Sequence, residues 1–224
     1  MGDIIQLPRV TESGKPRISY SQIRSYKSKK SFNLQIDGSL EYMIEYFMGH
    51  KFPDVGWGEF GHDVEGYIGE RKFAEKFDED EKKILDNIEP LGVLGEEFEI
   101  DFGEFVLVMI IDDRAKDWAK IRDYKTASKN SSKRYYEEDY KQLDIYALKP
   151  YMESGFIPEL EVKVIERKGN CMFGGGRDVL KVGKEVWTIQ RETSEERLEV
   201  IKNEIFTTVI EISDLYKEYL KLNK

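Results

Sequence analysis

Two short segments of the chain carry carboxylates and a lysine at positions where they would do chemistry together. Val106–Ile111 is an apolar run that ends directly before Asp112, and a strand-like segment downstream carries Asp123 and Lys125. Side chains two residues apart on a strand point to the same face, so Asp123 and Lys125 share one face. The polar stretch Arg114–Trp118 allows the chain to turn back, and antiparallel pairing would then place Asp112 opposite the neighbourhood of Asp123. Two carboxylates bind a hard divalent cation through oxygen, and a lysine beside that cation positions a water or neutralises a phosphate oxygen.

The first carboxylate of this group is open between two neighbours. Asp112 is favoured because it ends the apolar run, but a slip of one residue in the strand register would exchange it for Asp113. An Asp at a strand end is often only a turn residue, and 35% of the chain is charged, so Asp-x-Lys also arises by chance. The functional interpretation therefore depends on the segments around these residues.

The composition is that of a folded globular protein with an acidic surface. The chain has 224 residues, 40% of them hydrophobic, with 13 Tyr and 12 Phe, which is enough to bury a core. The net charge of −9 means that the global field does not attract nucleic acid. Clustered carboxylates can still serve metals, and local basic loops can still meet phosphates.

Cysteine content and hydropathy exclude several classes of site. Cys171 is the only cysteine, so an intrachain disulfide, a cysteine zinc site and an iron–sulfur cluster are all excluded. No stretch approaches eighteen apolar residues, and the N-terminus lacks the apolar segment of a signal peptide. We therefore expect a cytoplasmic protein without membrane contact.

Periodicity predicts a single α/β domain over residues 1–224, with helices flanking a central mixed sheet and with residues 1–17 flexible. Helices are expected from Ser19 or Ser21 to Tyr26, from Ser39 onward within 31–49, and over 59–77, 78–89, 135–153 and 194–222. Strands are expected over 94–100, 105–111, 120–124, 160–165 and 179–188.

Four segments, taken in order, resemble one enzyme family. They are the Ser-x-Ser pattern at Ser19 and Ser21, Gly58–His62, the pair formed by Asp112 and Asp123-Tyr-Lys-Thr, and Gln142–Tyr146. Together they resemble the PD-(D/E)xK nuclease superfamily, in particular its RecB-type branch, over residues 19–150. Met109 replaces the glycine that this branch has before its Ile-Asp pair, and the four cysteines of its cluster-bearing members are absent. The resemblance implies a restriction-endonuclease-like core without an iron–sulfur cluster.

The resemblance also assigns roles to residues. It implies Mg²⁺ or Mn²⁺ held by Asp112, Asp123, the backbone carbonyl of Tyr124 and His62, with Lys125 as the catalytic lysine and Gln142 beside it. Outside this context, His62 would be an ordinary surface or packed histidine. Glu97 is either an accessory ligand or DNA-end contact, or a solvated strand residue. Contacts to DNA are expected from Ser19, Ser21, Arg24, Lys129, Lys133, Arg134 and Tyr146.

The implied function is a Mg/Mn-dependent deoxyribonuclease. An exonuclease that works from DNA ends in recombination, repair or replication is favoured, because the basic stretches Arg17–Lys30 and Lys129–Arg134 suit threading a strand past the site. The alternatives are a structure-selective or nicking endonuclease on the same fold, and a non-catalytic DNA-binding module. DNA is the expected partner, together with a recombinase or a single-strand-binding protein, and the host cytoplasm is the expected location if the gene belongs to a phage.

Overall fold

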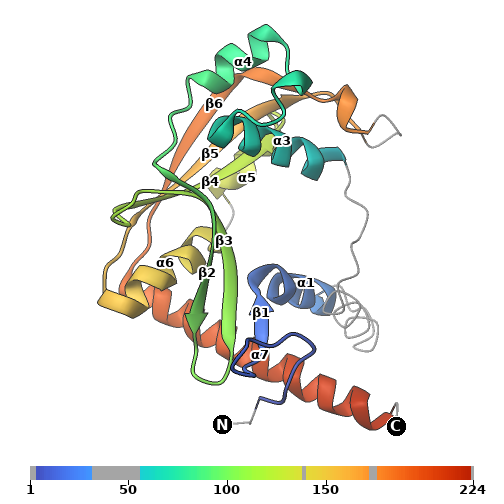
Figure 1. Cartoon of the computed structure of the whole chain (residues 1–224), viewed down its shortest axis with the longest axis vertical. Helices are drawn as coiled ribbons and strands as arrows, with labels where there is room; N and C mark the ends of the chain where they lie inside the picture. Colours follow the sequence, from blue (N-terminus) through green and yellow to red (C-terminus); the bar gives the residue numbers. More distant parts are fainter. Residues whose placement is uncertain (1–3, 32–55, 138–139, 172–175, 223–224) are drawn as a thin grey trace. The chain divides into compact units, whose positions relative to one another are not determined.

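The computed structural model describes residues 4–31, 56–137, 140–171 and 176–222. The helix expected from Ser39 onward lies outside these residues. The chain divides into two compact units, one formed by residues 1–52, 97–110 and 195–224 and the other by residues 53–96 and 111–194. Figure 1 shows the helices and strands of both units. Among the described helices, none combines the length and the apolar character needed to cross a membrane.

The first unit is built around two helices and the start of the sheet. Strand β1 (Arg17–Ser19) leads directly into helix α1 (Tyr20–Ser31) and pairs in parallel with strand β3 (Val106–Arg114). The long helix α7 (Glu195–Leu222) confirms the helix expected over 194–222, and it buries Leu198, Ile201, Ile205, Val209 and Ile212, which recur every three or four residues. Leu7 is buried and the Ile5 N–H donates to Ser213 Oγ, so part of the segment expected to be flexible packs in this unit.

The hydrogen-bonded strands form a six-stranded mixed sheet. Its order is β1-β3-β4-β5-β6, and strand β2 (Val93–Asp101) also pairs with β3. Strand β4 (Lys120–Ala127) is antiparallel to β3 and parallel to β5 (Glu159–Lys168), which is antiparallel to β6 (Lys181–Arg191). The prediction of an α/β fold with a central mixed sheet flanked by helices is confirmed.

Helix α3 (Gly56–Glu70) packs against strand β4 of the sheet. Its apolar residues Phe60, Val64, Tyr67 and Ile68 recur every three or four positions and share a core with Tyr124 and Ile165. The predicted helix over 59–77 ends early, because Arg71 and Phe73 adopt left-handed backbone conformations with φ of 57° and 60°. A short 3₁₀ turn (Ala74–Lys76) follows, and the Asp78 capping box starts helix α4 (Glu79–Asp86).

The predicted helix over 135–153 is two helices. A 3₁₀ turn (Ser131–Lys133) runs into the short helix α5 (Arg134–Glu137), and α6 (Lys141–Ser154) begins after Tyr140. Tyr140 has φ −86° and ψ 83°, which no helical residue adopts, so a continuous helix is excluded at this point. Helix α6 packs on β4 and β5 and ends at Gly155, whose φ of 73° suits a glycine. A last 3₁₀ turn (Arg177–Val179) precedes β6.

Candidate functional site

Strands β3 and β4 determine which acidic side chains meet. Asp113 pairs with Arg122 across the two strands, so the alternation of side chains places Asp112 on the opposite face, with Asp123 and Lys125. The Tyr124 N–H donates a 2.9 Å hydrogen bond to Asp112 Oδ2, which holds that carboxylate against β4. The structure therefore brings Asp112, rather than Asp113, together with the Asp-x-Lys residues.

The Lys125 ammonium lies among three oxygen atoms. Its Nζ is 2.7 Å from Asp123 Oδ2 and 3.8 Å from Asp112 Oδ2, and it donates to the Tyr124 carbonyl oxygen at 2.9 Å. These are the three oxygen donors that the family resemblance implies as metal ligands. A cation is thus already placed where three oxygen ligands converge.

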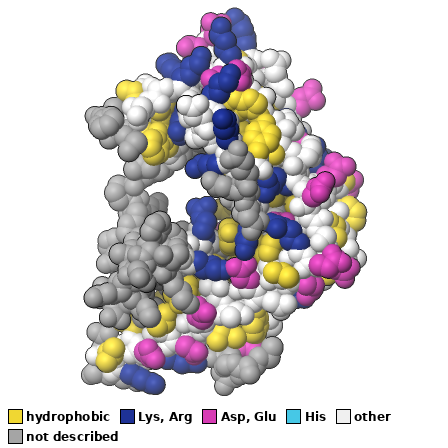
Figure 2. All heavy atoms as spheres, turned by 180° about the vertical axis from the view of Figure 1, so that it is seen from behind, with side chains coloured by type: hydrophobic (Ala, Val, Ile, Leu, Met, Phe, Trp, Pro, Cys, Tyr) yellow, Lys and Arg dark blue, Asp and Glu magenta, His cyan; other side chains and the backbone are white. Residues whose placement is uncertain are grey.

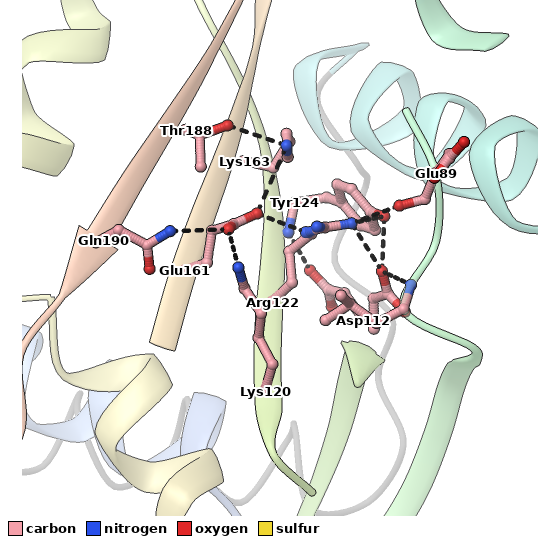
Figure 3. Close-up of polar contacts among 11 residues, drawn as sticks. Glu89, Asp112, Lys120, Arg122, Tyr124, Glu161, Lys163, Thr188 and Gln190 are labelled. Carbon is pink, nitrogen blue, oxygen red and sulfur yellow. Dashed lines mark hydrogen bonds and ion pairs between the residues drawn. The ribbon is translucent and has the colours of Figure 1, made fainter. Parts of the chain in front are cut away.

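Asp113 belongs to a separate polar network on the other face of β4. Both of its oxygens accept from the Leu91 N–H at 2.9 Å, and Oδ2 also accepts from the Tyr124 hydroxyl at 2.8 Å. Arg122 joins this carboxylate to Glu161, whose Oε1 accepts from Arg122 Nε at 2.7 Å (Figure 3). Gln190 donates to the other oxygen of Glu161 at 3.1 Å. Asp113 therefore links strands β3 and β4 to the segment before β2. Both of its oxygens already accept hydrogen bonds from these donors.

A chain of hydrogen bonds from α6 reaches Asp123. The Tyr140 hydroxyl lies 2.8 Å from Asp123 Oδ2 and 3.0 Å from Gln142 Oε1, and Gln142 Nε2 donates to the Tyr146 hydroxyl at 2.6 Å. Gln142 and Tyr146 are thus brought to the site as expected residues, whereas Tyr140 was missed. The only sequence signal for Tyr140 is its position two residues before Gln142. Asp123 Oδ1 is buried and has no hydrogen-bond partner among the described residues.

Helix α3 contributes a second residue that the sequence did not reveal. His62 and Glu65 are three residues apart, so they share one helix face, and both line a cavity of about 520 Å³ together with Lys125. The His62 side chain is exposed, with its ring 5.6 Å from that of Phe73. Glu65 interacts electrostatically with Lys125 and Asp123. The signal available in the sequence was its place one turn after the Gly58–His62 segment.

Two carboxylates of this cluster, those of Glu65 and Asp112, resist ionisation. Burial raises the pKa of Glu65 to about 7, with Lys125 opposing and Asp123 reinforcing the change. Burial and the nearby Asp123 also raise the pKa of Asp112 well above its ordinary value. Burial disfavours the charged form of Lys125, but the Asp123 and Asp112 carboxylates outweigh it and raise its pKa. A divalent cation bound beside Glu65 and Asp112 would favour the ionised forms of both carboxylates.

The metal ligands are not assembled as a set of side chains. Within the described ranges, no three His, Cys, Asp or Glu side chains are grouped closely enough to hold a metal ion as they stand. The oxygens around Lys125, however, have the chemistry of a hard-cation site, because two are carboxylates and one is a carbonyl. The bare, buried Asp123 Oδ1 adds a further oxygen without a donor. These residues fit a divalent cation once the ammonium moves aside.

The remaining expected residues lie in different places. Lys129 is paired with Glu185 at 2.9 Å, Lys133 is exposed, and Arg134 lines the cavity beside Lys125. In the other unit, Ser19 Oγ accepts from the Gln22 N–H at the start of α1 and lies 2.9 Å from Ser21 Oγ. Arg24 is exposed in that unit, and Glu97 is paired there with Arg17. Figure 2 shows both basic and acidic side chains on the visible face. A chain with a net charge of −9 can therefore still carry local positive patches.

A solved structure shares this fold. A candidate exonuclease from Eubacterium rectale is 12% identical in sequence and has a TM-score of 0.54, with 92% of this chain and 87% of that chain covered. A phage-related exonuclease from Haemophilus somnus 129PT is 11% identical, with a TM-score of 0.48, and 92% of this chain and 97% of that chain are covered. No family model and no curated protein matches the sequence. The likeness to the first structure shows that the two proteins have the same fold.

Proposed function

We propose that this protein is a metal-dependent deoxyribonuclease that hydrolyses phosphodiester bonds from DNA ends. The observation that carries the proposal is the convergence of Asp112, Asp123 and the Tyr124 carbonyl on the Lys125 ammonium. The shared fold with a protein described as an exonuclease supports it, and so do the RecB-type segments of the sequence. Roles in recombination, repair or replication extend the same proposal.

The metal would be Mg²⁺ or Mn²⁺. Asp112, Asp123 and the Tyr124 carbonyl would hold it, and His62 and Glu65 on α3 are the side chains that would complete the ligand set. When bound, the ion would lower the pKa of a water molecule and screen the charge that develops on the phosphate. Asp112 and Asp123 could hold it only if the Lys125 ammonium moved away from their oxygens, because two cations cannot share the same oxygens.

The chain's own residues then position the reacting groups. Lys125, whose ammonium lies 2.7 Å from Asp123 Oδ2, would offer positive charge to a non-bridging phosphate oxygen. The Tyr140 hydroxyl, directly before α6, holds Asp123 in place. Gln142 accepts from Tyr140 and donates in turn to the Tyr146 hydroxyl. The exposed cations Lys133 and Arg134 follow β4 and suit contact with the phosphate backbone rather than with bases.

Linear and covalently closed DNA of the same sequence distinguish the forms of this proposal. With Mg²⁺ or Mn²⁺, the protein should degrade end-labelled linear DNA and leave the closed circle intact. Equal cleavage of the closed circle would reject the exonuclease and establish an endonuclease on the same fold. Binding of DNA without cleavage of either substrate, in either metal, would instead establish a non-catalytic module.

A further inference from the structure

The cavity beside Lys125 has a lining that is unusually basic for an acidic protein. Lys125, Arg134 and Arg167 all line it, and Glu65 is the one carboxylate among its lining residues. The chain as a whole has a net charge of −9. A local excess of positive charge in a concave site concentrates anionic ligands there.

Two of these cations have no acidic partner among the residues that the structure describes. Neither Arg134 nor Arg167 pairs with a carboxylate in the part of the chain that the structure describes. Five other arginines do form such pairs: Arg17, Arg71, Arg114, Arg122 and Arg177. The two arginines of the cavity are therefore left with their charge available to a ligand.

Two buried N–H donors of the cavity also lack acceptors within the described ranges of the chain. Trp57 Nε1 and Arg167 Nε are both buried and without a hydrogen-bond partner among the described residues. The Arg167 guanidinium lies over the Trp57 ring, 5.1 Å from its centroid, so the two side chains form one unit. Leaving two buried donors unsatisfied is unfavourable, and both side chains line the same cavity. An anion with several acceptor oxygens would satisfy both donors at once.

Aromatic side chains complete the cavity. Trp57 and Tyr135 line it, and the Arg134 guanidinium lies 4.7 Å from the centroid of the Tyr135 ring. The volume of about 520 Å³ lies within the range of small-ligand sites. Nucleotides combine a phosphate with a planar base, and protein sites for single-stranded nucleic acid pair cationic groups with aromatic faces in the same way.

We propose that this cavity is a nucleotide-binding subsite, in which Arg167, Trp57 Nε1 and Arg134 bind a phosphate of the DNA strand next to the reacting one. The proposal rests on the nuclease function, since it places this phosphate beside Lys125. The phosphate is either the terminal monoester of a strand end, with three non-bridging oxygens, or an internal diester, with two, and either has enough acceptor oxygens for both unsatisfied donors.

Binding of thymidine 5′-monophosphate to the full chain without metal tests the subsite independently of catalysis. The indole N–H signal of Trp57, identified in a ¹H–¹⁵N spectrum by its loss in Trp57→Phe, should shift as the nucleotide is added. Thymidine without phosphate should leave it in place. Arg167→Gln should weaken the nucleotide affinity at least about tenfold, or about 1.4 kcal/mol. Lys168→Gln, which removes the next cation along β5 outside the cavity, should leave the affinity unchanged.

Oligonucleotide binding then identifies the source of the phosphate. The binding constant for single strands should fall less steeply with salt in Arg167→Gln. The magnitude of the slope of its logarithm against log salt should decrease by about 0.7, the share of one phosphate contact. Tighter binding of a strand with a terminal phosphate than of the same strand with a hydroxyl end assigns the subsite to a strand end, and equal binding assigns it to an internal phosphate.

Three results would overturn the subsite. They are a Trp57 signal that does not respond to the nucleotide, equal responses to thymidine and its monophosphate, and equal losses in Arg167→Gln and Lys168→Gln. A protein that binds the nucleotide as expected but cleaves no DNA would retain the subsite and reject the nuclease function, so the two failures are separate.

Discussion

The Lys125→Met variant should have a lower melting temperature than the wild type when no metal is present. Its ability to bind metal should be retained. The change removes the ammonium that lies 2.7 Å from Asp123 Oδ2 and 3.8 Å from Asp112 Oδ2, while it keeps an unbranched side chain. Asp123 is completely buried, so it would lose its partner charge without access to water. Breaking such a pair costs about 3 kcal/mol, the lower end of the usual range, because the Tyr140 hydroxyl still lies 2.8 Å from the same oxygen. For a chain of this length, that cost lowers Tm by roughly 6–12 °C.

Adding metal should reverse this loss. In Lys125→Met the divalent ion would bind the same carboxylates without a competing ammonium, so Mn²⁺ should raise Tm more in this variant than in the wild type. The affinity of Lys125→Met for Mn²⁺, measured by calorimetry, should equal or exceed that of the wild type. Turnover should nevertheless fall by a factor of about 10² to 10³, since the charge-stabilising group is gone. Lys168→Met, at an exposed lysine of β5, is the matched control and should behave as the wild type. Weaker Mn²⁺ binding in Lys125→Met, or an unchanged Tm in EDTA, would refute the reasoning.

Further predictions concern the residues around the cluster. Tyr140→Phe removes the hydroxyl at Asp123 and should reduce turnover on labelled linear DNA about tenfold or more. Tyr136→Phe, at an exposed position, is the control and should keep the wild-type rate, and equal rates in the two variants would mean that Tyr140 is purely structural. Glu161 is buried, but its bonds with Lys120 and Arg122 lower its pKa from 4.5 to about 2. Its contribution to the free energy of unfolding, on the order of 3 kcal/mol, is therefore complete above pH 4.5 and lost as the pH falls through 2. Acid unfolding of Glu161→Gln should lack this step, and identical acid profiles would contradict the assignment. His62→Ala and Glu65→Gln should each weaken Mn²⁺ binding in calorimetry if both side chains complete the ligand set, and a variant with wild-type affinity would remove its residue from that set.

The sequence predicted the strands of the site because their residues have strong and simple patterns. The apolar run before Asp112 forms β3 and the Asp-x-Lys segment forms β4, as expected. It left the choice between Asp112 and Asp113 open, since both residues follow the same run and only the pairing register separates their faces. The register places Asp113 opposite Arg122, where it accepts hydrogen bonds from several donors, and so leaves Asp112 on the face of Asp123 and Lys125.

Residues contributed by turns and helix faces were harder to predict. Tyr140 interrupts what looks like one continuous helix, and its hydroxyl reaches Asp123 only because the backbone leaves the helical conformation there. Glu65 joins the cluster because α3 packs against β4, a contact that periodicity alone does not specify. Arg167 was missed for a similar reason: it meets Trp57 across more than one hundred residues of chain, and no local pattern links the two.

The rate of hydrolysis of end-labelled linear DNA by the wild type and by Asp123→Ala tests the central claim most directly. The wild type should release labelled product with Mg²⁺ or Mn²⁺ and none in EDTA. Asp123→Ala should lose at least about a hundredfold in rate while its circular dichroism spectrum stays that of the wild type. Cleavage by Asp123→Ala at the wild-type rate, or no cleavage by the wild type in either metal, would contradict the account.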